Sequence, residues 1–72
     1  MRKEINQIIR NYAYKNGGCY KSAWDCLYRQ FNFQNSMNVQ RMAIMKNVRP
    51  IDVVEKMGGL ACLLQIAKTM FE

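Results

Sequence analysis

The lysines and arginines are the side chains of this sequence best able to do chemistry, because they can bind anions. Residues 1–49 carry nine of them against two carboxylates, a net charge of +7, whereas residues 50–72 carry two against three, a net charge of −1. This asymmetry predicts a basic surface that attracts an acidic protein or a nucleic acid, although small domains also carry net charge for solubility. The residues that we expect to contact an anionic partner are Arg29, Arg41, Lys46 and Arg49.

Catalytic groups are almost absent. The chain has no His, so a Ser or Cys nucleophile lacks its commonest general base. Its five carboxylates are scattered, and neither Gly-Gly pair has the flanking strand and the spacing of a phosphate-binding loop. We therefore expect no enzymatic activity and no cofactor.

Three cysteines are an odd number, and they form no Cys-x-x-Cys pair. The apolar stretch from Ile5 to Ile9 is too short and too polar for a secretory signal. We therefore expect reduced thiols in a cytoplasm, packed as small buried hydrophobic residues. A zinc site would have to borrow ligands from another chain, so we expect no metal. No apolar run approaches the ~20 residues of a membrane span, and we expect no membrane partner.

The element that should organise the fold is a helix from Tyr20 or Ser22 to Phe31. Its apolar residues recur at helical spacing, Ser22 is a plausible N-cap, and the polar run that begins at Asn32 should end it. The stripe consists of Tyr20, Ala23, Trp24, Leu27, Tyr28 and Phe31.

Four further helices are predicted around this stripe, over Arg2–Lys15, Met37–Asn47, Pro50 to before Gly58, and Leu60–Phe71. The helix over Met37–Asn47 is the least regular, because Ile44 and Met45 blur its apolar stripe. These helices predict one all-α domain over residues 1–72, a small bundle of four to five short helices. So short a chain buries only ~60% of its unfolded surface, so a homodimer is possible. The expected core is Ile8, Tyr12, Trp24, Leu27, Phe31, Leu60, Leu63 and Leu64.

Two kinds of binding fit these elements. The helices before and after the polar turn would form a helix-turn-helix, with Arg41 and Lys46 on the reading helix and Asn38 and Gln40 contacting bases or phosphates. The other kind is protein binding through apolar side chains off the main stripes, namely Tyr14, Phe33 and Met45.

Three stretches resemble the C-terminal helical domain of phage antirepressor-type regulators. They are Tyr-x-x-Ala-Trp-x-x-Leu-Tyr-x-x-Phe at residues 20–31, Ile-Asp-x-x-Glu-x-Met-Gly-x-Leu at residues 51–60, and the final Ala-Lys-Thr-Met-Phe. The resemblance implies a small helical module of temperate phages, which follows an N-terminal domain in a protein that antagonises a repressor or binds DNA. Here Met1 opens the module, so we expect a stand-alone copy.

The sequence therefore predicts a phage or prophage regulatory module that binds a protein partner, either a repressor or a host factor, in the bacterial cytoplasm. One alternative is a small anti-defence inhibitor of the anti-CRISPR type, which would cover a host immune complex or its nucleic acid. The other is a DNA- or RNA-binding regulator that uses a basic helical face. An exposed apolar patch with a polar rim would favour protein binding, and a dense Arg and Lys patch would favour nucleic acid.

Overall fold

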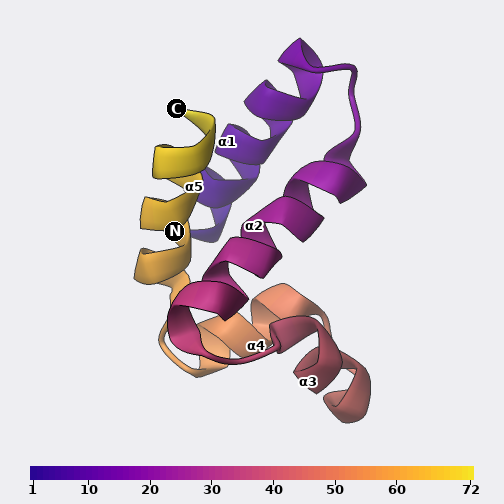
Figure 1. The fold of residues 1–72 in the computed structure, drawn as a ribbon, viewed down its shortest axis with the longest axis vertical. Coiled ribbons are helices and arrows are strands. Elements are labelled where there is room, and N and C mark those ends of the chain that lie inside the picture. Colours follow the sequence, from indigo (N-terminus) through magenta and orange to yellow (C-terminus); the bar gives the residue numbers. More distant parts are fainter.

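Five α-helices joined by short turns make up the structure, a computed structural model that describes residues 1–72 (Figure 1). They are α1 (Arg2–Lys15), α2 (Tyr20–Asn35), α3 (Val39–Lys46), α4 (Pro50–Lys56) and α5 (Leu60–Phe71). Helices α1 and α2 run antiparallel, α5 packs against both, and α3 and α4 lie together across one end. The predicted all-α bundle is confirmed, and α1 and α5 begin and end where their apolar periodicity placed them.

Of the two predicted starts of α2, Tyr20 is confirmed, whereas the predicted N-cap at Ser22 is wrong. The helix begins at Tyr20, and Cys19 takes the N-cap position without a side-chain capping bond. Two glycines with left-handed φ angles, Gly17 at 97° and Gly18 at 82°, reverse the chain before this point. Because glycine adopts such angles without strain, the turn is complete early enough for the helix to start before Ser22. The Ser22 hydroxyl instead accepts a hydrogen bond from the Cys19 thiol at 3.1 Å.

The end of α2 was also predicted wrongly, because the helix continues through the polar run to Asn35. Asparagine shortens helices when its side chain competes for the local backbone. Here the Asn32 side chain bonds the start of α3 instead, and Asn35 Nδ2 donates to the Phe31 carbonyl within the helix at 2.9 Å. Ser36 then ends α2 in the left-handed conformation, and Asn38 supplies the N-cap of α3.

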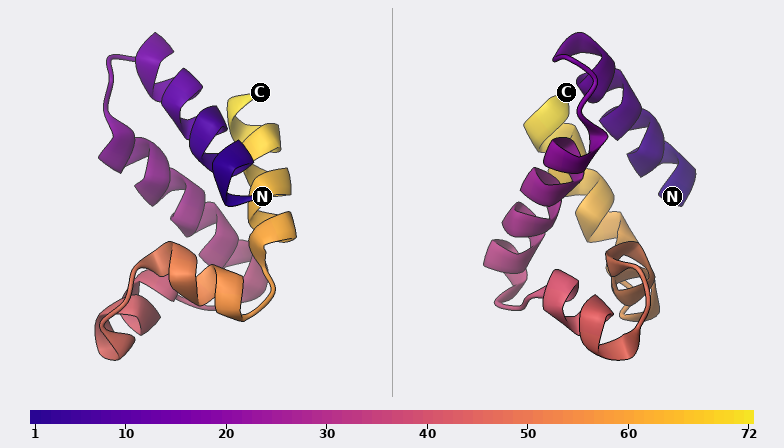
Figure 2. Two further views of the ribbon diagram at one scale, coloured as in Figure 1. Left: turned by 180° about the vertical axis from the view of Figure 1, so that it is seen from behind. Right: turned by 90° about the vertical axis from the view of Figure 1, so that its right-hand side faces the viewer.

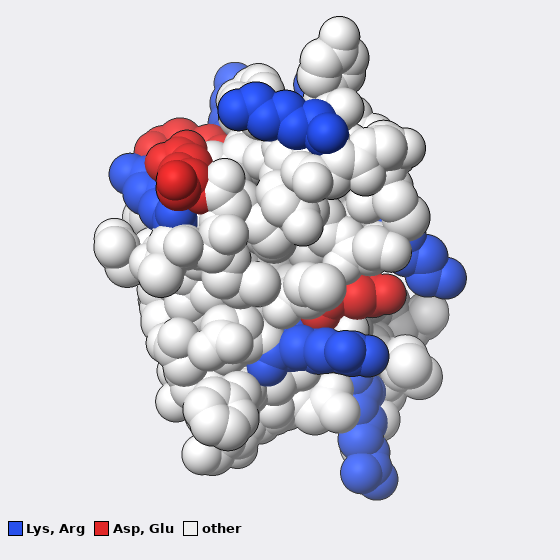
Figure 3. Space-filling model, turned by 45° about the horizontal axis from the view of Figure 1, so that its top comes forward, with Lys and Arg blue, Asp and Glu red and all other residues white.

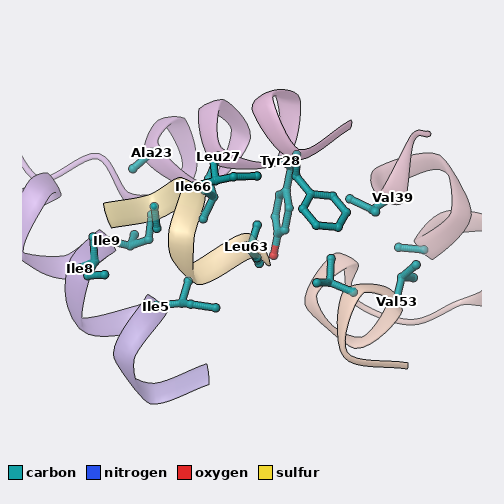
Figure 4. Packing of buried hydrophobic residues seen from close by; sticks show 14 residues of the cluster. Ile5, Ile8, Ile9, Ala23, Leu27, Tyr28, Val39, Val53, Leu63 and Ile66 are labelled. Carbon is teal, nitrogen blue, oxygen red and sulfur yellow. The ribbon is translucent and has the colours of Figure 1, made fainter. Parts of the chain in front are cut away.

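The core lies where α1, α2 and α5 meet and continues between α2, α3 and α4 (Figure 4). Four of the eight predicted core residues are buried there, and the other four are half-buried against its edge. Trp24 belongs to the second group, so the stripe of α2 is buried most deeply through Leu27 and Phe31, while Tyr20 is exposed. The buried four are Ile8, Leu27, Phe31 and Leu63, and the half-buried four are Tyr12, Trp24, Leu60 and Leu64.

The prediction of buried thiols was wrong, because Cys19, Cys26 and Cys62 are all exposed. Small side chains at these positions fall beside the apolar stripes of α2 and α5 rather than on them. No Cys, Asp and Glu side chains gather in a group of three that could hold a metal ion. No helix has both the length and the apolar character needed to cross a bilayer.

Candidate functional site

Helix α3 lies at one end of the bundle and contacts only two of the other helices. It packs on α2 and α4 and makes no contact with α1 or α5. The views in Figures 1 and 2 agree that it projects at the end of the molecule away from both chain termini. One side of this short helix is therefore free of contacts within the chain.

The free side of α3 carries large apolar residues. Val39 and Ala43 point inward and are buried. Ile44 and Met45 point the opposite way, and their exposed fractions are 81% and 77%. Arg41 lies three and four residues before them, which places it on the same outward face. A helix with apolar residues on both faces is usually covered on both faces. Only one face of α3 is covered.

We call this exposed region the α3 surface. It consists of Arg41, Ile44 and Met45 on the outward face of the helix, Lys46 as its last residue, and Val48 in the turn that follows. Val48 is held there because Asn47 adopts the left-handed conformation and the Val48 N–H donates to the Ala43 carbonyl at 3.0 Å. All five residues are exposed. The surface therefore combines three apolar side chains with two cations.

The cations of the α3 surface form no ion pair within the chain. The ion pairs of the protein involve only the N-terminal amine and Arg2, which contact Glu4, Asp52 and Glu55. Arg41 and Lys46 take part in none of them. Their charges are consequently available to a partner, which is the electrostatic condition for steering an acidic surface into contact.

The four predicted anion-binding residues do not form one cluster. Arg41 and Lys46 lie on the α3 surface. Arg49 is the residue before α4 and lines a cleft that also involves α1. Arg29 is exposed on α2. On the face shown in Figure 3, most basic side chains are separated by uncharged surface, some meet at the lower right, and acidic groups lie among them. That face offers no dense basic patch.

The two residues predicted to contact bases are occupied within the protein. The Asn38 side chain accepts a hydrogen bond from the Arg41 N–H at 2.9 Å and so caps α3. The Gln40 side chain accepts one from Asn32 Nδ2 at 3.2 Å. Base recognition by either residue would require breaking a bond that holds α3 in place.

Sequence reasoning missed the most informative residue of the surface, Ile44, although its signal was present. Ile44 and Met45 blurred the apolar stripe of this segment because they belong to a second, outward apolar face. The predicted exposure of Tyr14, Phe33 and Met45 is confirmed, with exposed fractions of 89%, 82% and 77%. Tyr14 and Phe33 lie on α1 and α2 rather than on α3.

Comparison with known proteins finds no family model, curated protein or solved structure that matches the chain. The likeness to antirepressor domains accordingly stays a prediction from the sequence.

Proposed function

We propose that the protein is a binding module that docks onto an acidic protein through the α3 surface. The observation that carries this proposal is the outward exposure of Ile44 and Met45 on a helix whose other face is already buried. On soluble proteins, large exposed apolar patches rimmed by polar groups are typical of interaction sites. Burial of these two side chains would supply the apolar part of the interface.

The positive charge of the α3 surface favours an acidic partner. Arg41 and Lys46 precede and follow the apolar residues along α3 and have no carboxylate of their own chain within ion-pair distance. An acidic partner would neutralise them. A second copy of the chain docked symmetrically on the same face would bring like charges together, because a two-fold interface places the same patch on both subunits. The α3 surface therefore favours a different, acidic protein over self-association.

The resemblance to antirepressor domains narrows the partner further. We infer a phage- or prophage-encoded regulator whose partner is a repressor or another host-cell factor. If the partner belongs to a host immune complex, the protein would act in the same way, by binding the partner and occluding its surface. Direct binding of nucleic acid is less well supported, because Asn38 and Gln40 are engaged in the fold and the basic residues are dispersed.

The first test is photo-crosslinking in the host cell, with a photoreactive amino acid placed at position 44. The matched control places it at position 33, which is exposed to the same degree but lies on α2. We expect an adduct with one protein from position 44 and none of that protein from position 33. No adduct at position 44, or the same adducts from both positions, would overturn the proposal.

The second test measures affinity with the purified partner, beginning with the repressor of the encoding phage. Ile44→Ser with Met45→Ser should weaken binding at least about tenfold, because two buried apolar anchors are lost. Tyr14→Ser with Phe33→Ser, which removes two exposed aromatic side chains from α1 and α2, should leave the affinity unchanged. Arg41→Ala with Lys46→Ala should slow association and reduce its dependence on salt. Equal losses in the surface and control variants would contradict the proposed interface.

A further inference from the structure

A second site lies on another part of the molecule, in a cleft between α1 and α4. The backbones of these two helices do not touch. Arg2 reaches across the gap, with its Nη1 atom 3.2 Å from Glu55 Oε1 and 3.5 Å from Asp52 Oδ1. The cleft beside this bridge has a volume of about 430 Å³, which is within the range of small-molecule sites.

Aromatic rings from α2 line the cleft. Trp24 and Tyr28 stack on each other with ring centroids 5.4 Å apart and an angle of 25° between their planes. Both line the cleft, together with Ile51 of α4. Tyr28 is buried and fixed by the core, whereas Trp24 is half-buried. The pair is a rigid apolar surface of a kind on which a flat ring stacks.

The polar groups of the cleft are cationic or neutral. Arg2 is engaged by two carboxylates, but the Lys3 ammonium and the Arg49 guanidinium take part in no ion pair or side-chain hydrogen bond. They come from opposite sides of the cleft, one from α1 and one from the start of α4. The side-chain amide of Asn6, which also lines the cleft, has no hydrogen-bond partner in the protein. No carboxylate lines the cleft.

We propose that this cleft binds a nucleotide, with the base stacked against the Trp24–Tyr28 pair and the phosphate held by Lys3 and Arg49. Arg49 suits a phosphate because its guanidinium donates two parallel hydrogen bonds, and Lys3 adds a mobile point charge. The Asn6 amide is both donor and acceptor, as the edge of a base requires. The nucleotide is either free or the end of a single strand, since both present a base and a phosphate.

The only Trp of the chain is in the cleft, so its fluorescence reports binding directly. ADP, adenosine and inorganic phosphate are titrated separately, and a short single-stranded RNA with a 5′-phosphate forms a further arm. We expect the Trp24 fluorescence to change saturably with ADP or with the RNA. Adenosine alone and phosphate alone should bind more weakly. A higher affinity for ADP identifies a free nucleotide, and a higher affinity for the RNA identifies a strand end. No saturable change with either would overturn the proposal.

The deciding variant is Lys3→Ala with Arg49→Ala, which removes two exposed side chains and leaves the core intact. Its affinity should fall roughly tenfold for each charge removed. The matched control, Arg10→Ala with Lys68→Ala, removes the same two residue types from exposed positions outside the cleft. The control should bind as the unmodified protein does. Equal weakening in both variants would show attraction to net charge alone and would overturn the site.

Discussion

The ring of Phe31 lies against the backbone of Gly59 so closely that a Cβ atom on Gly59 would be 3.1 Å from Phe31 Cζ. The same Cβ would be 3.3 Å from Val54 Cγ1. Phe31 and Val54 are among the most deeply buried side chains of the protein. The turn between α4 and α5 therefore leaves little room for a side chain at position 59, and this contact joins the end of α2 to the start of α5.

Gly59→Ala should destabilise the fold by about 1–3 kcal/mol, the usual cost of forcing an extra methyl group into a packed core. Strain of the backbone contributes little, because the φ angle of Gly59 is −95°, which any residue adopts. The measurement is the free energy of unfolding in urea. In a Phe31→Leu background, which opens space at the contact, the same substitution should cost less. An unchanged cost would show that the contact with the ring is unimportant.

Asn32 fixes the position of α3 relative to α2. Its Oδ1 accepts the Val39 N–H at 2.9 Å, and its Nδ2 donates to Gln40 Oε1 at 3.2 Å. Asn32→Leu keeps the volume but removes both bonds, and should cost about 1–3 kcal/mol because partly buried polar groups lose their partners. Hydrogen exchange at the Val39 amide should become faster.

Two further variants control for this effect. Asn32→Asp keeps an acceptor for the Val39 N–H and should protect that amide better than Asn32→Leu does. Asn11→Leu removes an exposed amide that only accepts from Gln7 at 2.9 Å, and should change stability by less than about 0.5 kcal/mol. A Val39 amide that stays equally protected in Asn32→Leu would show that Asn32 does not hold α3 in place.

The Tyr28 hydroxyl should make the fold sensitive to alkaline pH. Burial raises the pKa of Tyr28 to about 12, opposed by the charge of Arg2 and assisted by those of Asp52 and Asp25. The unfolded chain loses this proton near pH 10, whereas the folded chain holds it to about pH 12. Unfolding consequently releases a proton between these pH values. The contribution of the protonated Tyr28 to the free energy of unfolding is therefore fully present below pH 10 and is lost as the pH rises through about 12.

Thermal unfolding of the native chain and of Tyr28→Phe, measured at several pH values between 9 and about 12, tests this relation. The native chain should lose more stability than Tyr28→Phe over this range, because phenylalanine has no proton to release. Parallel curves for the two proteins would show that Tyr28 is not the group responsible.

Cys19 should be a reactive thiol. Its side chain is exposed, and the hydrogen bond between the Cys19 and Ser22 side chains lowers the pKa of Cys19, as do backbone hydrogen bonds at Ser22 and Lys21. A lower pKa raises the fraction of thiolate, which is the nucleophilic form. Ser22→Ala should therefore slow alkylation of Cys19 by iodoacetamide near neutral pH, as measured by peptide mass spectrometry. Cys62, exposed on α5, is the internal control and should react at an unchanged rate.

Local patterns in the sequence were sufficient for the class of fold and for most helix boundaries. The apolar periodicity of α1 and α5 is a property of neighbouring residues, and so are the turn formed by Gly17 and Gly18 and the helix start at Pro50. Each of these features depends on steric and hydrogen-bonding preferences within a few residues, so each was predicted at its position.

Features that depend on distant residues were not predictable in this way. Helix α2 continues past Phe31 because Asn32 finds its partners in α3, which local propensity does not reveal. The thiols are exposed because the packing of α1, α2 and α5 covers other faces.

The candidate sites divide along the same line. The sequence by itself determined that the chain is basic, helical and without catalytic pairs, since composition and spacing suffice for those statements. Only the tertiary structure decided that Ile44 lies on an uncovered face and that Lys3, Trp24 and Arg49 line one cleft. The physical reason is that helical periodicity defines which residues share a face, whereas the packing of the helices decides which faces water can reach.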